Sequence, residues 1–523
     1  MAIVEDYVPD SDDEDTTEAE VLAQKPLAVH PVEQHESNSH ATKGSSASEL
    51  IDQLYVPEAF NDTLHTSQST PSHIESCQRR IQSALSQLST IWPRETREGN
   101  AGNTLGNPIP DIDVKVYIAV TRLRGINEGP DGTLITPEIL KVVDEILQAC
   151  PDSTKTSQAL LLDLKTVFAS KPHPDISVDS GRRLMRPVGG EAGRSDLFDD
   201  QVWKEQWGTW NTLRWCVEVM STQDLIDQIP MILPPLLILL DDYKSSYRIR
   251  GLQILPAFLR IPPHVLHRTG IAQLLLRSIQ HSISLHPAPP EPPLLEASLQ
   301  RLIDLLHVLY PAGQGKEAEA AKQIEEAVEK GVINGWAYAK SGQEGVEALV
   351  SVARAVEMVC REVDLGVIRW MRTFIPSLLS PLMMPPIPYI IPVQLANLQA
   401  LHTLLVTIEK TGRAARWRGE ILDGVGRMVV VLHERGHVVP LTDVERPSQG
   451  DQREAAARDH DFRFVSKIDS ADERQAELLS LSELCGRVFA DLIRVAPSMT
   501  ETEIPALLAL DPNAFGFLRR YQV

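Results

Sequence analysis

The chain has 523 residues, and its hydrophobic content of 43% is typical of a soluble globular protein, so chain length does not limit the core. The net charge is −21, and residues 1–50 hold 12 acidic and two basic side chains, so −10 of that charge lies at one end. The remainder is mildly acidic. This argues against a nucleic-acid-binding body, which needs a clustered Lys/Arg face.

Residues 1–45 are acidic, rich in Ser and Thr and poor in aromatic residues. Such a segment cannot bury enough apolar surface to offset its ordering entropy, so we expect a disordered tail. Ser11 is followed by four carboxylates, a context that acidophilic kinases prefer, and it is the candidate phosphosite. The alternative is an acidic tail that only solubilises the protein. Because the N-terminus lacks a basic and an apolar region, no secretory signal is expected.

Two further patterns bear on the compartment. The five cysteines are odd in number and widely spaced, which predicts reduced core thiols in a cytoplasmic or nuclear protein. Residues 373–408 contain no charged side chain, a length that raises the question of a membrane span. Six prolines between Pro376 and Pro392 cut this stretch into pieces, so we expect buried helices and no membrane.

The first helical region is expected at residues 46–195. Apolar residues recur at offsets of three and four in the stretches 77–92, 114–126, 137–150 and 157–168. Thr136 and Asp152 stand where helix caps are expected. A Gly/Pro-rich stretch, residues 169–195, then forms a linker to a second region, residues 196–523.

The second region alternates helical runs with short breaks. Residues 222–263 contain an apolar helix, a turn at Asp241–Asp242, basic residues Arg248 and Arg250, and a second apolar helix. This order resembles a HEAT repeat, in which the turn Asp and the inner-helix Arg link adjacent repeats. Weaker copies follow at 292–311, 366–408 and 417–435; a polar insertion is expected at 438–470 and a helix at 471–495. The predicted fold is all-α: a degenerate HEAT/armadillo-like solenoid of helical hairpins with a disordered acidic N-terminal tail.

Four of the eight tryptophans lie within "VWKEQWGTWNTLRWC", residues 202–216. At helical spacing Trp203, Trp207 and Trp210 share one side, where Arg214 is placed to stack on Trp207 or Trp210, and Trp215 points to a second side. Stripes of this kind are usually core, so we predict an inner helix between two layers. The alternative is a surface that binds a partner.

The string "HERGH" matches HExxH, in which two histidines bind zinc and the Glu is the general base: His433, Glu434 and His437. Gly436 and Pro440 predict that the helix ends within the motif, and no extended zinc spacing follows. A zinc peptidase is therefore a distant alternative. No phosphate-binding glycine motif follows a strand, and no nucleophile elbow is present, so no cofactor is expected.

The segment from Trp203 to Pro256 resembles the Tti-two family, the second Tel-two-interacting protein. The residues that carry the resemblance are Trp203, Lys204, Trp207, Trp210, Trp215, Pro234, Pro235, Asp241, Asp242, Arg248, Arg250 and Gly251. Later runs fit in the same order, so the resemblance extends over about residues 196–435.

The resemblance implies a non-enzymatic scaffold subunit of the Triple T (TTT) co-chaperone complex, with Tel-two-like and Tti-one-like partners. In that family the complex supports folding, assembly and stability of phosphatidylinositol-3-kinase-related kinases, together with the ninety-kilodalton heat-shock chaperone. It would act in the cytoplasm and nucleus, in DNA-damage signalling, telomere maintenance and nutrient sensing. An unrelated HEAT-repeat adaptor, for transport or phosphatase assembly, is the alternative.

Overall fold

The structure is a computed structural model, and it describes residues 47–57, 60, 71–99, 111–125, 134–168, 173, 175–176, 182–184, 201–287, 291–313, 315–439 and 471–521. The chain divides into two compact units, Met1–Ser45 and Ser46–Val523, and the described residues all belong to the second. Within these ranges the regular elements are helices, and the extended pairing is limited to one bridge between Ile176 and Arg183. The prediction of an all-α helical fold is confirmed.

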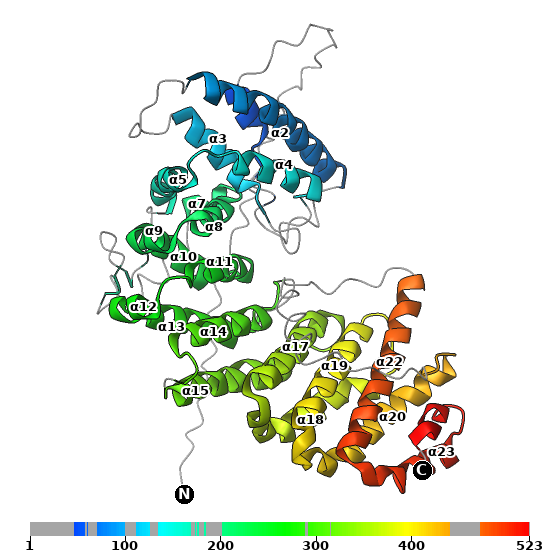
Figure 1. The fold of residues 1–523 in the computed structure, drawn as a ribbon. Coiled ribbons are helices and arrows are strands. Elements are labelled where there is room, and N and C mark those ends of the chain that lie inside the picture. Colours follow the sequence, from blue (N-terminus) through cyan, green and yellow to red (C-terminus); the bar gives the residue numbers. More distant parts are fainter. Residues whose placement is uncertain are drawn as a thin grey trace, which may run out of the picture. The chain divides into compact units, whose positions relative to one another are not determined.

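The first helices of the unit form a layered group (Figure 1). They are α1 (Ala47–Gln53), α2 (Pro71–Gly99), α3 (Asp111–Arg122), α4 (Pro137–Gln148) and α5 (Ser153–Phe168). The two predicted caps are confirmed: the Thr136 hydroxyl accepts from the Ile139 amide at 3.3 Å, and the Asp152 carboxylate accepts from the Lys155 amide at 3.0 Å. Such bonds satisfy amides that the first helical turn leaves unpaired.

Helical hairpins follow, each packed on the next (Figure 1). The elements are α7 (Val202–Glu205), α8 (Thr209–Val219), α9 (Thr222–Asp227), α10 (Ile229–Asp241), α11 (Ser245–Phe258), α12 (Pro263–Thr269), α13 (Ile271–Ser284) and α14 (Leu295–Leu309). α8 packs against α3 and α5 on one side and against α11 on the other, and α11 packs in turn on α14. The tryptophan segment therefore joins the first helices to the hairpins.

The remaining helices continue this succession. They are α15 (Glu317–Ala327), a π-helix (Val328–Ile333), α16 (Asn334–Tyr338), α17 (Val346–Val363), α18 (Met371–Leu379), α19 (Ile391–Ile408), α20 (Arg418–Glu434), α22 (Ala471–Val495) and α23 (Glu503–Leu510), with short 3₁₀ turns between them. α22 has the bounds predicted for it. α17 packs on α14 and α19, and α19 packs on α22.

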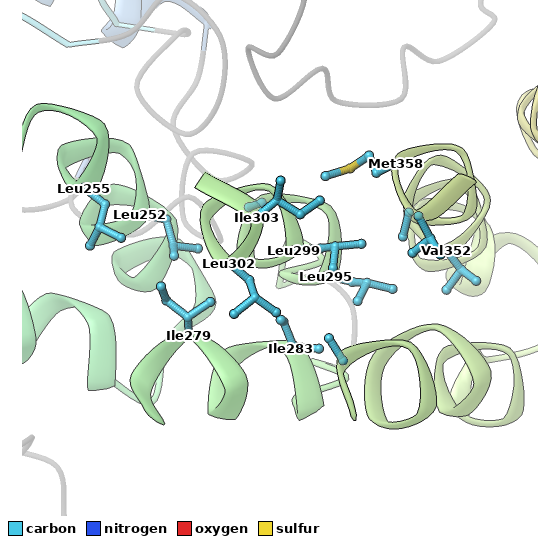
Figure 2. Close-up of a cluster of buried hydrophobic side chains, with 14 of the residues drawn as sticks. Leu252, Leu255, Ile279, Ile283, Leu295, Leu299, Leu302, Ile303, Val352 and Met358 are labelled. Carbon is cyan, nitrogen blue, oxygen red and sulfur yellow. The ribbon is translucent and has the colours of Figure 1, made fainter. Parts of the chain in front are cut away.

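The hydrophobic core lies between successive helices. Figure 2 shows one part of it, where side chains of α11, α13, α14 and α17 meet: Leu252, Leu255, Ile279, Ile283, Leu295, Leu299, Leu302, Ile303, Val352 and Met358. These side chains are at most 8% exposed. They belong to one cluster of buried residues that extends along the chain from Leu50 to Leu518. Each helix pair thus buries its apolar face against the next pair, as in helical repeat proteins.

One helix among the described residues, Ile391–Thr411, has the length and composition to cross a membrane, and 61% of its apolar 18-residue stretch is buried inside the protein. It contains α19, whose buried face includes the polar residues Gln394 and Asn397. Their amides donate to carbonyl oxygens of Met384 and Leu378 at 2.8 and 3.0 Å. The prediction that every proline from Pro376 to Pro392 cuts this stretch is wrong at two positions: Pro376 lies inside α18, and Pro392 stands in the first turn of α19, where its missing amide costs no bond.

Candidate functional site

The tryptophan segment is not one continuous helix. α7 ends at Glu205 and α8 begins at Thr209, with Gly208 between them at φ +79°. A Cβ atom on Gly208 would lie 2.4 Å from the carbonyl oxygen of Arg122, so only glycine fits this close approach to α3. The prediction of a single helix is therefore wrong. The break turns Trp203 and Trp210 toward each other around a common neighbour, Tyr247 of α11.

All four tryptophans of the segment are at most 4% exposed. Trp203 stacks on Phe168 at 5.4 Å between ring centroids and meets Tyr247 edge-on at 4.8 Å. Trp207 contacts Trp210 edge-on at 6.0 Å. Arrangements of this kind add to the stabilisation from burial alone. The indole rings are thus core groups that join α5, α7, α8 and α11.

Lys204 lies in an aromatic cage closed by a carboxylate. Its Nζ atom is 2.7 Å from Oδ2 of Asp242 and 4.6 to 5.4 Å from the ring centroids of Tyr243, Tyr247 and Trp203. Asp242 is fully buried; burial raises the pKa of its carboxyl group, and the charge of Lys204 opposes that shift. The turn Asp of the predicted ladder therefore pairs with a lysine of the preceding segment instead of an arginine.

The cation that stacks on the tryptophans also differs from the predicted one. Arg250 of α11 lies 3.6 Å from the centroid of the Trp210 ring. Arg214, expected in that role, instead donates to Glu218 at 2.7 Å. Glu218 lies four residues further along the same helix, where an arginine and a glutamate pair readily. The stacking partner of Trp210 comes from a different helix, 40 positions later in the sequence.

The contacts among Trp203, Lys204, Trp210, Asp242 and Arg250 form a junction between helices. Asp241 and Arg248 link this junction to the next hairpin. Asp241 Oδ2 lies 3.1 Å from His173 Nε2. Burial opposes ionisation of Asp241, but His173, Ser278 and Arg248 together outweigh that effect and hold its pKa below the usual range. Arg248 donates to the carbonyl oxygens of Asp241 and Asp242 and, at 2.8 Å, to Ser282 of α13. The arginine thus joins neighbouring hairpins through a hydroxyl group and backbone carbonyls.

Three signature residues shape the backbone of the hairpin. Pro234 and Pro235 lie inside α10, where the helix is continuous from Ile229 to Asp241. Gly251 faces α10: a Cβ atom there would lie 3.0 Å from the side chain of Leu240 and 3.1 Å from its backbone nitrogen. The glycine lets α10 and α11 approach closely, which explains its place in the motif.

Part of the predicted linker at 169–195 contacts the second region. Besides His173, the carboxylate of Asp175 pairs with Arg277 of α13 at 2.6 Å. The pattern-based prediction missed these two residues, because contacts about 70 and 100 positions away leave no periodic signal. The only feature of the sequence that could have indicated these contacts is the presence of a histidine and an aspartate inside a Gly/Pro-rich stretch.

The HExxH motif lacks the geometry that zinc binding requires. α20 ends at Glu434, and Gly436 follows at φ +83°, so His437 is not on the helix that carries His433. The His437 amide bonds back to the carbonyl oxygen of Leu432 at 2.9 Å. Across the described ranges, no group of three or more His, Cys, Asp or Glu side chains is arranged to hold a metal ion.

The five cysteines are free, and four of them are buried: Cys77, Cys216, Cys360 and Cys485. Burial raises the pKa of the Cys485 thiol to about 12, and it raises the pKa of Cys216 and Cys360 as well. These thiols stay protonated at neutral pH and are poor nucleophiles.

Ser11, the candidate phosphosite, lies outside the described residues.

A second group of ion pairs, most of them partly buried, escaped the sequence prediction. Glu357 of α17 pairs with Arg361 at 3.2 Å, Glu296 of α14 pairs with Arg354 at 3.4 Å, and His402 of α19 contacts Asp491 of α22. Burial raises the pKa of Glu357 to about 7, with Glu296 adding to the shift and the arginines and His402 opposing it. The group joins four helices that pack one on the next: α14, α17, α19 and α22.

The junction can support and orient helices, and its charged groups are engaged in that role. The sequence also matches a known protein family over the residues that form this arrangement. Residues 129–388, about half of the chain, match the model of the Tti2 family, a range that includes the tryptophans, Lys204, Asp242 and Arg250. The chain is also 29% identical over 135 residues to TELO2-interacting protein 2 of Rattus norvegicus, which covers 25% of this chain and 26% of that protein. The chain thus matches about a quarter of the length of this curated relative. Through residues 129–388, which hold the whole junction, the chain belongs to the Tti2 family.

Proposed function

We propose that the protein is a non-enzymatic scaffold subunit of the TTT co-chaperone complex. The observation that carries the proposal is the match of residues 129–388 to the Tti2 family, because this range contains the junction and the hairpins packed on it. The name of the rat relative describes an interaction with TELO2, and we propose the corresponding partner here, with a Tti-one-like subunit. Stacked helical hairpins offer long surfaces for such partners.

The proposed clients are the phosphatidylinositol-3-kinase-related kinases, which the complex would help to fold, assemble and stay stable together with the ninety-kilodalton heat-shock chaperone. Their roles would connect the protein to DNA-damage signalling, telomere maintenance and nutrient sensing. The scaffold needs no cofactor. We place it in the cytoplasm and nucleus, where reduced thiols such as Cys216 and Cys360 persist.

Depletion of the protein from cells tests the client role. We expect the amounts of the kinase proteins to fall while their messenger RNA levels stay constant, since newly made chains that fail to assemble are degraded. Re-expression of the full chain restores the kinases. Unchanged kinase levels after complete depletion would contradict the proposal.

The acidic sequence around Ser11 gives the proposal a second test. We propose that a phosphate on Ser11 recruits the chaperone adaptor to the scaffold. Full-length protein phosphorylated at Ser11 is compared with the Ser11→Ala variant in a pull-down of that adaptor. Greater recovery with the phosphorylated protein supports this role, and equal recovery removes it while leaving the scaffold proposal intact.

A further inference from the structure

A short basic turn stands out on this acidic protein. It consists of two 3₁₀ turns, Glu409–Thr411 and Arg413–Trp417, between α19 and α20. Lys410, Arg413 and Arg416 in it are exposed, and no carboxylate among the described residues lies within salt-bridge distance of them. Neighbouring arginines do have such partners: Arg418 pairs with Glu503 at 2.7 Å and Arg427 with Asp423 at 2.8 Å.

The 3₁₀ geometry places two of these cations together. Side chains three positions apart eclipse each other in a 3₁₀ helix, so Arg413 and Arg416 project from one side. By the same spacing Ala414 and Trp417 share another side, which faces the protein: Ala414 is fully buried and Trp417 packs on the hydrophobic core. Because Ala414 and Trp417 are packed against the protein, Arg413 and Arg416 must point toward the solvent.

The basic turn is also held firmly. Gly412 takes a φ of +64°, and the Thr411 hydroxyl donates to the Ile408 carbonyl oxygen at 2.7 Å while accepting from the Arg413 amide at 3.3 Å. Arg418 donates to the carbonyl oxygen of Ala415 at 3.1 Å. A ligand would therefore lose little binding energy in ordering the backbone of this turn.

Folding stability does not account for the two arginines. Lys410 follows the C-terminus of α19, where the helix dipole favours a cation. Arg413 and Arg416 come before the N-terminus of α20, where the dipole disfavours one. Neither arginine forms an ion pair with a described carboxylate, so an anion from outside the described residues is the partner that fits them.

We propose that the basic turn binds an acidic segment of another protein, with Arg413 and Arg416 pairing with two of its carboxylates. Arginine forms paired hydrogen bonds with carboxylates, and a rigid pair of arginines selects for two of them in succession. Nucleic acid fits less well: the total charge of −21, less the −10 of residues 1–50, leaves −11 on the rest of the chain, which repels a long polyanion. The binding does not depend on the assembly proposed above.

Fluorescence anisotropy with the full-length protein tests this inference, using a labelled peptide of eight glutamates as the probe. The double variant R413Q/R416Q should raise the dissociation constant by about tenfold, since two partly screened charge pairs are lost. The matched control R79Q/R427Q removes two other exposed arginines and the same net charge, and it should stay within about twofold of the parent. All four sites are exposed, so unchanged thermal melting accompanies both variants.

Three outcomes would overturn the inference. They are absence of binding by the parent, an equal loss in R413Q/R416Q and in the control, and tighter binding of a single-stranded oligothymidine with the same number of charges. The last result would assign the basic turn to nucleic acid. Failure of this experiment leaves the role in the TTT complex unaffected, because that role is measured by kinase levels and by partner identity.

Discussion

Lys204 shows how single residues hold this protein together. Its ammonium group meets three aromatic rings and the fully buried carboxylate of Asp242, so one cation connects α7 to the turn between α10 and α11. A buried charge that loses its partner is strongly destabilising, whereas the pair itself contributes little net energy. The junction therefore depends on all its members being present together.

Trp207→Ala tests whether the tryptophans act as core groups. The side chain is 4% exposed, so truncation should lower the free energy of unfolding by roughly 3 to 5 kcal/mol. Chemical denaturation of the full chain measures this loss. Leu510→Ala is the control: that side chain is 77% exposed, and its removal should change stability by less than about 0.5 kcal/mol. A Trp207→Ala protein as stable as the parent that no longer binds its partner would make the segment a binding surface.

Glu357 predicts a pH dependence of stability. Burial raises its folded pKa from the ordinary value of 4.5 to about 7, so the folded state holds a proton that the unfolded state releases between these values. The stabilisation that Glu357 contributes to the free energy of unfolding is fully present below pH 4.5 and is lost as pH rises through 7. The loss amounts to about 3 kcal/mol.

Glu357→Gln removes this titration. The free energy of unfolding of the variant minus that of the parent should increase by roughly 2 to 3 kcal/mol as pH rises from 4.5 to 8. The reason is that only the parent must ionise a buried group over this range. Urea denaturation at a series of pH values measures the difference. A constant difference between the two proteins across this range would show that Glu357 titrates normally.

At the scale of helices, the corner between α7 and α8 depends on Gly208. Gly208→Ala should destabilise the protein by roughly 2 kcal/mol or more, because it combines a positive φ with a clash against the Arg122 carbonyl oxygen. Gly412→Ala is a matched comparison: φ is +64°, but a Cβ atom there meets nothing within 4 Å, so only the backbone cost of about 1 kcal/mol applies. Thermal denaturation compares them, and equal losses would show that the contact with α3 is unimportant.

The sequence predicts the helices well where apolar spacing and caps coincide. The caps at Thr136 and Asp152 and the bounds of Ala471–Val495 are as expected. α17 was not predicted, although Val346, Val350 and Ala353 carry a helical spacing that could have identified it. Gly208 was overlooked as a break, since its positive φ is set by a contact with a helix some 90 positions earlier.

The same reason limits the prediction of the junction. Sequence resemblance selected Lys204, Asp242 and Arg250, whereas helical spacing assigned the stacking role to Arg214, which shares α8 with Trp210. Periodicity reports neighbours within one helix, and the contact of Arg250 with Trp210 joins two helices. The partner of Asp241, His173, lies in a stretch predicted as a linker for the same reason.

On the scale of the whole molecule, the described residues of the second unit share one main core, beside a small separate cluster of Val346, Val350, Ile390 and Val393. The cluster of buried residues extends from Leu50 to Leu518, so each hairpin is supported by its neighbours and a defect in the junction weakens helices on both sides. The predicted boundaries at residues 195, 435 and 470 stay predictions. The Lys204–Asp242 pair connects helices within this core, whereas Glu357 costs stability when it ionises as pH rises through 7.

Affinity purification of the tagged full chain, with its partners identified by mass spectrometry, shows whether the protein assembles with TTT subunits. We expect Tel-two-like and Tti-one-like proteins to co-purify with the parent chain and to be recovered in smaller amount with the destabilised Trp207→Ala variant. The exposed Leu510→Ala variant should retain both partners. Absence of both proteins from the parent preparation, with the chain itself folded and recovered, would contradict the account.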